Sequence, residues 1–136
     1  MNKLLTVLLA LSCLSSPVMA KDKPPLTKDQ TWQVLVLSVF KLSAKQNHGK
    51  PKLIVFCQKD PAVCLEAVKY TGTNKRDHIL REIYSTKHKL IVRDVCEFNI
   101  AGNSRVCNNF DTGINSIETK TKDGNWIRIQ TENPSI

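Results

Sequence analysis

Hydrophobic residues follow two different spacings along this chain. Between residues 27 and 46 they recur every three or four positions, which places them on one face of a helix. Thr27 and Gln30 have the spacing of a capping box, in which two side chains satisfy the first free amides of a helix. The segment is rich in β-branched residues, but it exceeds the usual length of a strand. We therefore predict a helix here, with a buried face made of Trp32, Leu35, Val36, Val39 and Phe40.

Two further helices are expected in the middle of the chain, after one short strand. The apolar run 52–57 suits a buried strand. Asp60 and Pro61 then form a helix start, because Asp caps free amides and proline has no amide to lose at the first helical position. This start predicts a helix over 61–70. A second helix is predicted over 75–85, where apolar residues share one face and charged residues the other.

From residue 89 onward apolar and polar residues alternate, as they do in strands with one buried face. Three segments of turn-forming residues, 100–103, 111–113 and 122–124, divide this part into strands joined by hairpins. Pairing the strands about the first turn sets Cys96 directly opposite Cys107. That register is the one a cross-strand disulfide requires.

The last hairpin has two candidate registers. A three-residue loop with Gly124 in the left-handed conformation sets Ile117 opposite Ile129 and Thr119 opposite Ile127. A two-residue loop would instead place lysine and glutamate opposite those isoleucines. The three-residue loop gives the better packed face, and we predict it. Together these elements predict an α+β fold, with N-terminal helices packed on one face of a C-terminal antiparallel β-meander.

Residues 1–20 have the three parts of a secretory signal: a positive start, an apolar core and small residues before a cut after Ala20. The apolar core is too short to span a membrane. We therefore expect a cleaved signal peptide over 1–20, a flexible leader over 21–26 and a single domain over 27–136, in the periplasm or secreted. An alternative is a lipoprotein tethered to a membrane through Cys13, because Ala10–Cys13 is similar to the box that precedes a lipidated cysteine.

Four cysteines remain after the signal, and an even number in a small exported chain predicts two disulfides. Three pairings exist, and we prefer Cys57–Cys64 and Cys96–Cys107 because each pair straddles one tight connection. No two cysteines have the spacing of a zinc or thioredoxin motif, and the histidines lack metal-ligand spacing. We expect a disulfide-stapled domain with no metal and no cofactor.

Positive charge is concentrated in the first part of the mature chain. Residues 21–93 carry fifteen Lys or Arg against six Asp or Glu, whereas residues 94–136 carry four against six. Six of the basic residues occur close together and form a candidate partner-binding face on the predicted helices: Lys75, Arg76, Arg81, Lys87, Lys89 and Arg93. Such a face suits an acidic protein, an anionic envelope polymer or the peripheral surface of a membrane, and it also suits a merely solvated surface.

The sequence offers little that resembles an active site. No nucleophile elbow, phosphate-binding loop or paired catalytic carboxylates can be identified, and the Asp111-Thr112-Gly113 triplet suits a hairpin turn. Nucleic acid is not an expected partner, because export removes the protein from it and no aromatic residues lie among the basic ones. We therefore expect a non-enzymatic accessory or binding protein of the bacterial cell envelope. The alternatives are a small cell-wall hydrolase and an inhibitor or immunity protein.

Overall fold

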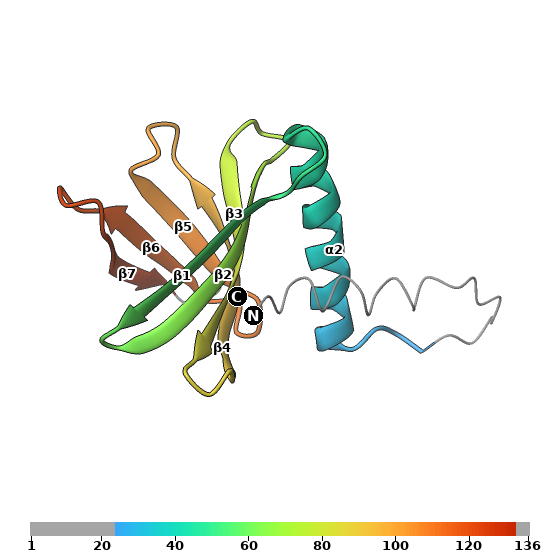
Figure 1. The fold of residues 1–136 in the computed structure, drawn as a ribbon, viewed down its shortest axis with the longest axis horizontal. Helices are drawn as coiled ribbons and strands as arrows, with labels where there is room; N and C mark the ends of the chain where they lie inside the picture. The colour runs from blue at the N-terminus through green and yellow to red at the C-terminus, as the bar shows by residue number, and fades with distance from the viewer. Residues whose placement is uncertain (1–23, 133–136) are drawn as a thin grey trace.

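A computed structural model describes residues 24–132. In this part of the chain, one helix precedes a seven-stranded antiparallel sheet whose strands follow one another in sequence order (Figure 1). The elements are α2 (Lys28–Gln46), β1 (Lys52–Lys59), β2 (Ala62–Thr71), β3 (Asp77–Ser85), β4 (Leu90–Phe98), β5 (Ser104–Asn109), β6 (Asn115–Lys120) and β7 (Trp126–Glu132). The fold is therefore α+β but mostly β, and within residues 24–132 a single helix accompanies the meander.

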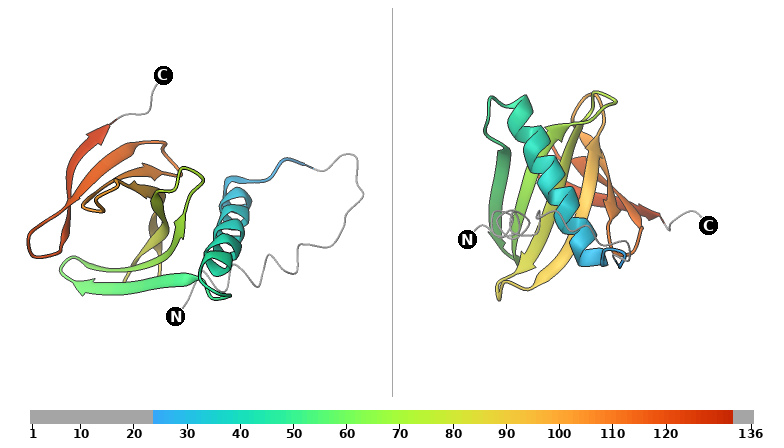
Figure 2. Two further views of the ribbon diagram at one scale, coloured as in Figure 1. Left: turned by 90° about the horizontal axis from the view of Figure 1, so that it is seen from above. Right: turned by 90° about the vertical axis from the view of Figure 1, so that its right-hand side faces the viewer.

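Helix α2 begins where the capping box predicts. The Thr27 hydroxyl accepts a hydrogen bond from the Gln30 amide, and the Gln30 side chain accepts one from the Thr27 amide. The apolar face of the helix packs on the outer face of the curled sheet (Figure 2). This core joins six buried residues of α2, β2 and β3: Trp32, Val36, Val39, Phe40, Val68 and Leu80.

The sheet curls away from the helix, so that its other face becomes concave (Figure 2). A second, smaller core lies on this inner face and is made of Ala67, Ile79 and the disulfide between Cys96 and Cys107. Both disulfides join residues that are directly opposite on neighbouring strands, Cys57 with Cys64 and Cys96 with Cys107. The predicted pairing of the cysteines is confirmed. Two disulfides are typical of proteins in an oxidising compartment outside the cytoplasm.

The predicted helices over 61–70 and 75–85 are wrong, because these segments form β2 and β3. Asp60 and Pro61, joined by a cis peptide bond, form the turn between β1 and β2. Asp and Pro favour tight turns as well as helix starts, so this local signal fits both structures. The two segments pair with each other, and they pair with β1 and β4 over most of their lengths; this pairing holds them extended and outweighs their helical spacing.

The charged residues of β3 explain the rest of the error. Arg81 and Glu82 are both buried, on opposite faces of the sheet. A charged residue normally indicates a solvent-facing position, so the segment has the pattern of an amphipathic helix. In fact the strand is buried on both faces: Arg81 is neutralised by Asp94 and Glu118, and Glu82 accepts a hydrogen bond from the Trp32 indole of the helix.

The predicted hairpins of the C-terminal half are present. Thr119 lies opposite Ile127, as the three-residue loop predicts. Ile117, however, lies opposite Gln130 rather than Ile129, because a bulge between Ile117 and Glu118 shifts the register by one residue.

The predicted signal peptide, Cys13 and the first part of the leader lie outside the described residues. The rest of the leader, residues 24–26, has no regular secondary structure. No helix in residues 24–132 is both long and apolar enough to cross a membrane.

Candidate functional site

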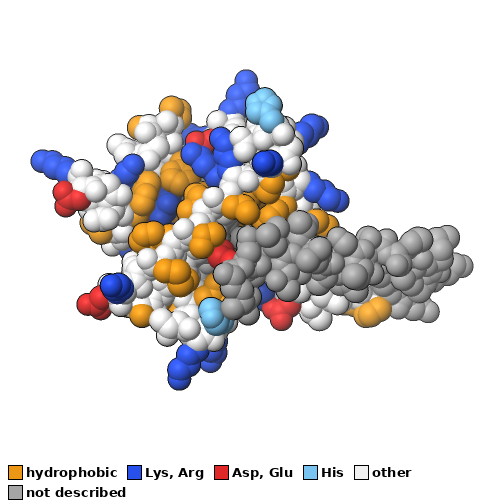
Figure 3. Space-filling model, in the orientation of Figure 1, with side chains coloured by type: hydrophobic (Ala, Val, Ile, Leu, Met, Phe, Trp, Pro, Cys, Tyr) orange, Lys and Arg blue, Asp and Glu red, His pale blue; other side chains and the backbone are white. Residues whose placement is uncertain are grey.

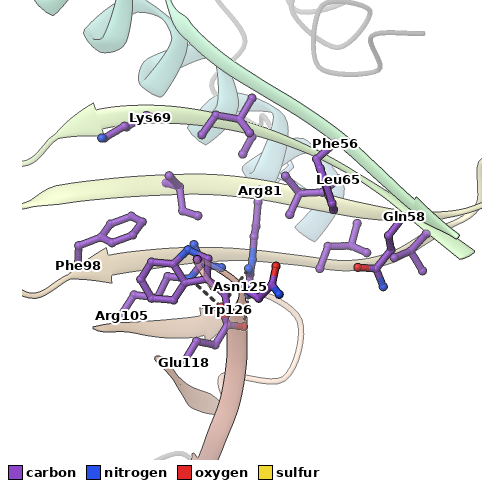
Figure 4. A pocket seen from close by; sticks show the side chains of 16 residues that line it. Phe56, Gln58, Leu65, Lys69, Arg81, Phe98, Arg105, Glu118, Asn125 and Trp126 are labelled. Carbon is purple, nitrogen blue, oxygen red and sulfur yellow. Dashed lines mark hydrogen bonds and ion pairs between the residues drawn. The ribbon is translucent and has the colours of Figure 1, made fainter. Parts of the chain in front are cut away.

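The concave face of the sheet holds a cleft of about 640 Å³ (Figure 4). Strands β1 to β3 form one wall, and the turn between β6 and β7 faces them. Alternate residues of a strand point to opposite faces, so every second side chain of these strands points into the cleft. The apolar wall consists of Ile54, Phe56, Val63, Leu65, Ile79 and Ile83.

A buried guanidinium lies at the bottom of the cleft. Arg81 donates to Asp94 through Nε at 2.7 Å and through a terminal nitrogen at 3.1 Å. It also donates to Glu118 at 2.8 Å. Burial would lower the pKa of Arg81, but the two carboxylates outweigh it and raise that pKa. Arg81 is thus fully paired and joins β3, β4 and β6 across the inner face.

Arg105 lies nearer the mouth of the cleft and has fewer partners. Its Nε donates to Glu118 at 2.7 Å, and its guanidinium carbon lies 4.1 Å from the centre of the Trp126 ring. Phe98 lies beside it, with the ring centre 5.5 Å from the same carbon. Among residues 24–132, no acceptor other than Glu118 is within hydrogen-bond distance of Arg105. Burial lowers the pKa of Arg105, which Glu118 only partly offsets.

Glu118 is the acceptor that these cations share. Arg81 and Arg105 bind its two oxygens, and Arg128 approaches to 3.8 Å. Burial acts to raise the pKa of Glu118, but the bonds and charges of Arg81 and Arg105 are stronger and hold that pKa below its usual value of 4.5. The three guanidinium groups share two carboxylates, those of Asp94 and Glu118, which leaves one positive charge in excess.

Strand β1 forms one border of the cleft and one edge of the sheet. Among the strands that the structure describes it pairs only with β2, and all eight of its residues are exposed. Four consecutive apolar residues, Leu53 to Phe56, lie in the middle of the strand, and Val55 and Phe56 are 62% and 58% exposed. Hydrophobic side chains therefore run across the middle of the surface in Figure 3, and lysines and arginines project around its rim.

The six basic residues of the candidate partner-binding face do not form one surface. Lys75 and Arg76 lie in the turn between β2 and β3, while Lys87 and Lys89 lie in the turn between β3 and β4, at the opposite end of the sheet. Arg81 is buried in the cleft.

Arg93 is buried on the outer face, where its guanidinium binds Asp111 at 2.7 Å and Asp29 at 2.9 Å. It also lies over the rings of Trp32 and Phe110. The hydrogen bond from Arg93 is the main cause that holds the pKa of Asp111 below its usual range. Arg93 thus joins the helix to the sheet, and its charge is not available to a partner.

One group of potential metal ligands exists in the described part of the chain, namely Asp94, Cys96 and Cys107. The two sulfur atoms are joined in a disulfide, so neither can supply a thiolate. This group does not offer the donor set that a structural zinc or copper site uses.

Sequence reasoning missed the principal residues of the cleft. Arg105, Glu118 and Trp126 lie on three different strands and carry no motif. A signal was present in the alternation of the C-terminal strands, because Phe98, Arg105 and Glu118 fall on the same face once the hairpins are paired. The alternation predicts that these three side chains share one face of the sheet, but it does not predict that this face is concave.

No protein-family model, curated protein or solved structure matches this chain.

Proposed function

We propose that this protein is an exported, non-enzymatic binding protein that holds a partner protein by pairing strand β1 with a strand of that partner. The observation that carries the proposal is the exposed, apolar edge formed by β1. An unpaired edge presents a row of free amides and carbonyls, to which an extended segment of another chain can add as a further strand.

Edge strands are normally protected against such pairing by prolines, bulges, inward charges or short length. Strand β1 has eight residues, no proline and no bulge, and its only charged residues are Lys52 and Lys59 at its two ends. Strand β7, the other edge, is different because the charged Arg128 interrupts its apolar residues and binds Glu118. Of the two edges, β1 is the one open to a partner.

The charges around β1 favour an acidic partner. Lys50 and Lys52 lie at one end of the sheet together with Lys75 and Arg76, because β1 starts where β2 ends and β3 begins. At the other end, Lys59 lies at the same end as the turn between β3 and β4. That turn contributes Lys87 and Lys89.

A partner strand with apolar residues in its middle and acidic residues at both ends complements this edge. A second copy of β1, aligned antiparallel over its full length, would set Lys52 opposite Lys59 and is disfavoured by like charge.

The non-enzymatic part of the proposal is supported by the state of Glu118, the one carboxylate among the described residues that line the cleft. Asp94 and Glu118 both bind Arg81, and the pKa of Glu118 is held low. A carboxylate in this state is a poor proton donor, whereas a glycoside hydrolase needs one carboxylic acid with a raised pKa.

The test is capture of the partner by two matched variants. Val55→Lys places a charge in the middle of β1, and Ile100→Lys makes the corresponding change in the turn between β4 and β5, where Ile100 is 91% exposed. We expect the tagged mature protein to retain one partner from the native envelope fraction at high salt. Val55→Lys should lose that partner and Ile100→Lys should keep it. Equal retention by both variants would show that β1 is not the contact.

A further inference from the structure

We propose that the cleft is a second binding site, separate from the β1 edge, for a single-chain amphiphile with a carboxylate head group. In this site Arg105 binds the carboxylate, and the apolar wall of β1 to β3 covers the alkyl chain. The proposal rests on the geometry of one arginine and on the wall beside it.

The guanidinium group of Arg105 is held in a fixed orientation, and its two terminal nitrogens have no hydrogen-bond partner among residues 24–132. Glu118 binds Nε, and Trp126 covers the guanidinium at 4.1 Å. These two contacts fix the plane of the group, yet among the described residues neither terminal nitrogen has an acceptor. No polar side-chain atom of the described residues is both buried and unpartnered, so these nitrogens are in contact with solvent at the cleft. A planar fork of this kind binds a carboxylate through two parallel hydrogen bonds.

The charge of the cluster favours an anion. Three guanidinium groups share two carboxylates, and the excess positive charge is not balanced by any further acid of the cluster. Burial makes the charged form of Arg105 less stable, as its lowered pKa indicates. A bound carboxylate would offset this cost.

The remainder of the cleft suits an alkyl chain. Ile54, Phe56, Leu65 and Ile83 line it, and the side chain of Lys69 lies at one border. From β5, which carries Arg105, to β1 the sheet crosses four strand spacings, or about 19 Å at the usual separation of strands. A cleft of about 640 Å³ lies in the range of sites that bind small organic ligands. The cleft has a long apolar wall and one guanidinium group with free donors at its end. This arrangement matches an amphiphile better than a sugar or a nucleotide.

The experiment compares two probes with the same tail. Dodecanoate and dodecanol are titrated into the mature protein by calorimetry, below the concentration at which either aggregates. We expect saturable one-to-one binding of dodecanoate, with dodecanol binding at least about tenfold more weakly because it cannot form a charged, bidentate pair. Equal binding of the two probes, or no saturable binding of dodecanoate, would overturn the proposal.

Binding of the same two probes to variants then tests whether the cleft is the site. Arg105→Lys keeps the charge but loses the fork, and we expect it to weaken dodecanoate binding about tenfold while leaving dodecanol unchanged. Arg76→Gln is the matched control, because Arg76 is an exposed arginine in the turn between β2 and β3 and does not line the cleft, and its effect should be less than about twofold. If Arg105→Lys fails to fold, Phe56→Ala tests the wall instead, since Phe56 is mostly exposed. It should weaken both probes alike.

Failure of this proposal and failure of the β1 proposal can be told apart. The Val55→Lys variant alters the face of β1 that points away from the cleft, so it should bind dodecanoate as the wild type does. Loss of dodecanoate binding in Val55→Lys would contradict the separation of the two sites. The Arg105→Lys variant should in turn retain the captured protein.

Discussion

The two faces of this sheet are built from the same strands, but a helix covers the outer face and an open cleft lies on the inner face. On the outer face, α2 covers β2 to β4, and Trp32 both fills the core and donates to Glu82 at 2.9 Å. On the inner face Ile54 and Phe56 of the apolar wall stay exposed, and the two terminal nitrogens of Arg105 have no acceptor in residues 24–132. The outer face is thus covered within the described residues, whereas part of the inner face and the β1 edge stay exposed, and we propose that a ligand and a partner protein cover them.

The largest effect should come from the outer face. Trp32→Ala removes the largest fully buried side chain of the core and leaves Glu82 with one partner fewer. We expect a loss of about 3–5 kcal/mol in the free energy of unfolding, measured by urea denaturation. A loss below about 1 kcal/mol would show that the helix contributes little to the core.

A slightly smaller effect is expected at the buried cluster of the inner face. Glu118→Gln removes the charge that Arg81 and Arg105 share, and should cost about 3 kcal/mol because it leaves buried cations undercompensated. Glu97→Gln is the control, since Glu97 forms a more exposed pair with His78. That change should cost less than about 1 kcal/mol.

Glu118 should also make the stability of the protein depend on pH in the acidic range. The pKa of Glu118 is lower in the folded protein than its usual 4.5, so its contribution to stability is complete above that value and is lost as the pH falls through the folded pKa. Melting temperatures should stay nearly constant from about pH 7 to 5 and fall below about pH 4.5. The fall should be shallower in Glu118→Gln. Identical slopes in the two proteins would exclude Glu118 as the source.

The two disulfides should differ in accessibility, because one lies in the core of the inner face and the other joins the exposed edge strand to β2. Cys96 and Cys107 are buried in the inner core, whereas Cys57 lies exposed on the edge strand. Mild reductant should therefore cleave Cys57–Cys64 first, as mass spectrometry of alkylated peptides would show. Loss of either bond should cost about 2–3 kcal/mol. Earlier alkylation of Cys96 or Cys107 would contradict the burial of the inner core.

The smallest effect on stability is expected at the binding surfaces. Phe56→Ala and Val55→Lys alter side chains that are more than half exposed, and each should change the free energy of unfolding by less than about 0.5 kcal/mol. Their effects should appear in binding instead. Urea denaturation gives the first quantity, and the capture and titration experiments give the second. A loss near that of Trp32→Ala would mean that β1 belongs to the core.

Local signals predicted part of this fold well. The capping box at Thr27 and Gln30 fixed the start of α2, and the position of Cys107 opposite Cys96 gave the pairing of β4 with β5. Strands β2 and β3 could not be predicted in this way, because Arg81 and Glu82 have the appearance of solvent-facing residues and become buried only through residues distant in sequence.

The candidate site was less predictable than the fold. Because they lie close to other basic residues in the sequence, Arg81 and Arg93 were predicted to bind a partner. Both instead form ion pairs inside the protein. Arg105, an isolated basic residue in a neutral part of the chain, is the arginine of the cleft whose terminal nitrogens have no acceptor in residues 24–132. Its position depends on the curl of the sheet, which arises from the packing of all seven strands.

The most direct test of the central claim is hydrogen exchange of the protein with and without its captured partner. If β1 pairs with a strand of the partner, the amides of residues 53–59 that point away from β2 should become protected in the complex, while those of α2 should exchange as before. Protection confined to α2 or to the turn between β4 and β5, with β1 unchanged, would contradict the claim that the open edge is the binding surface.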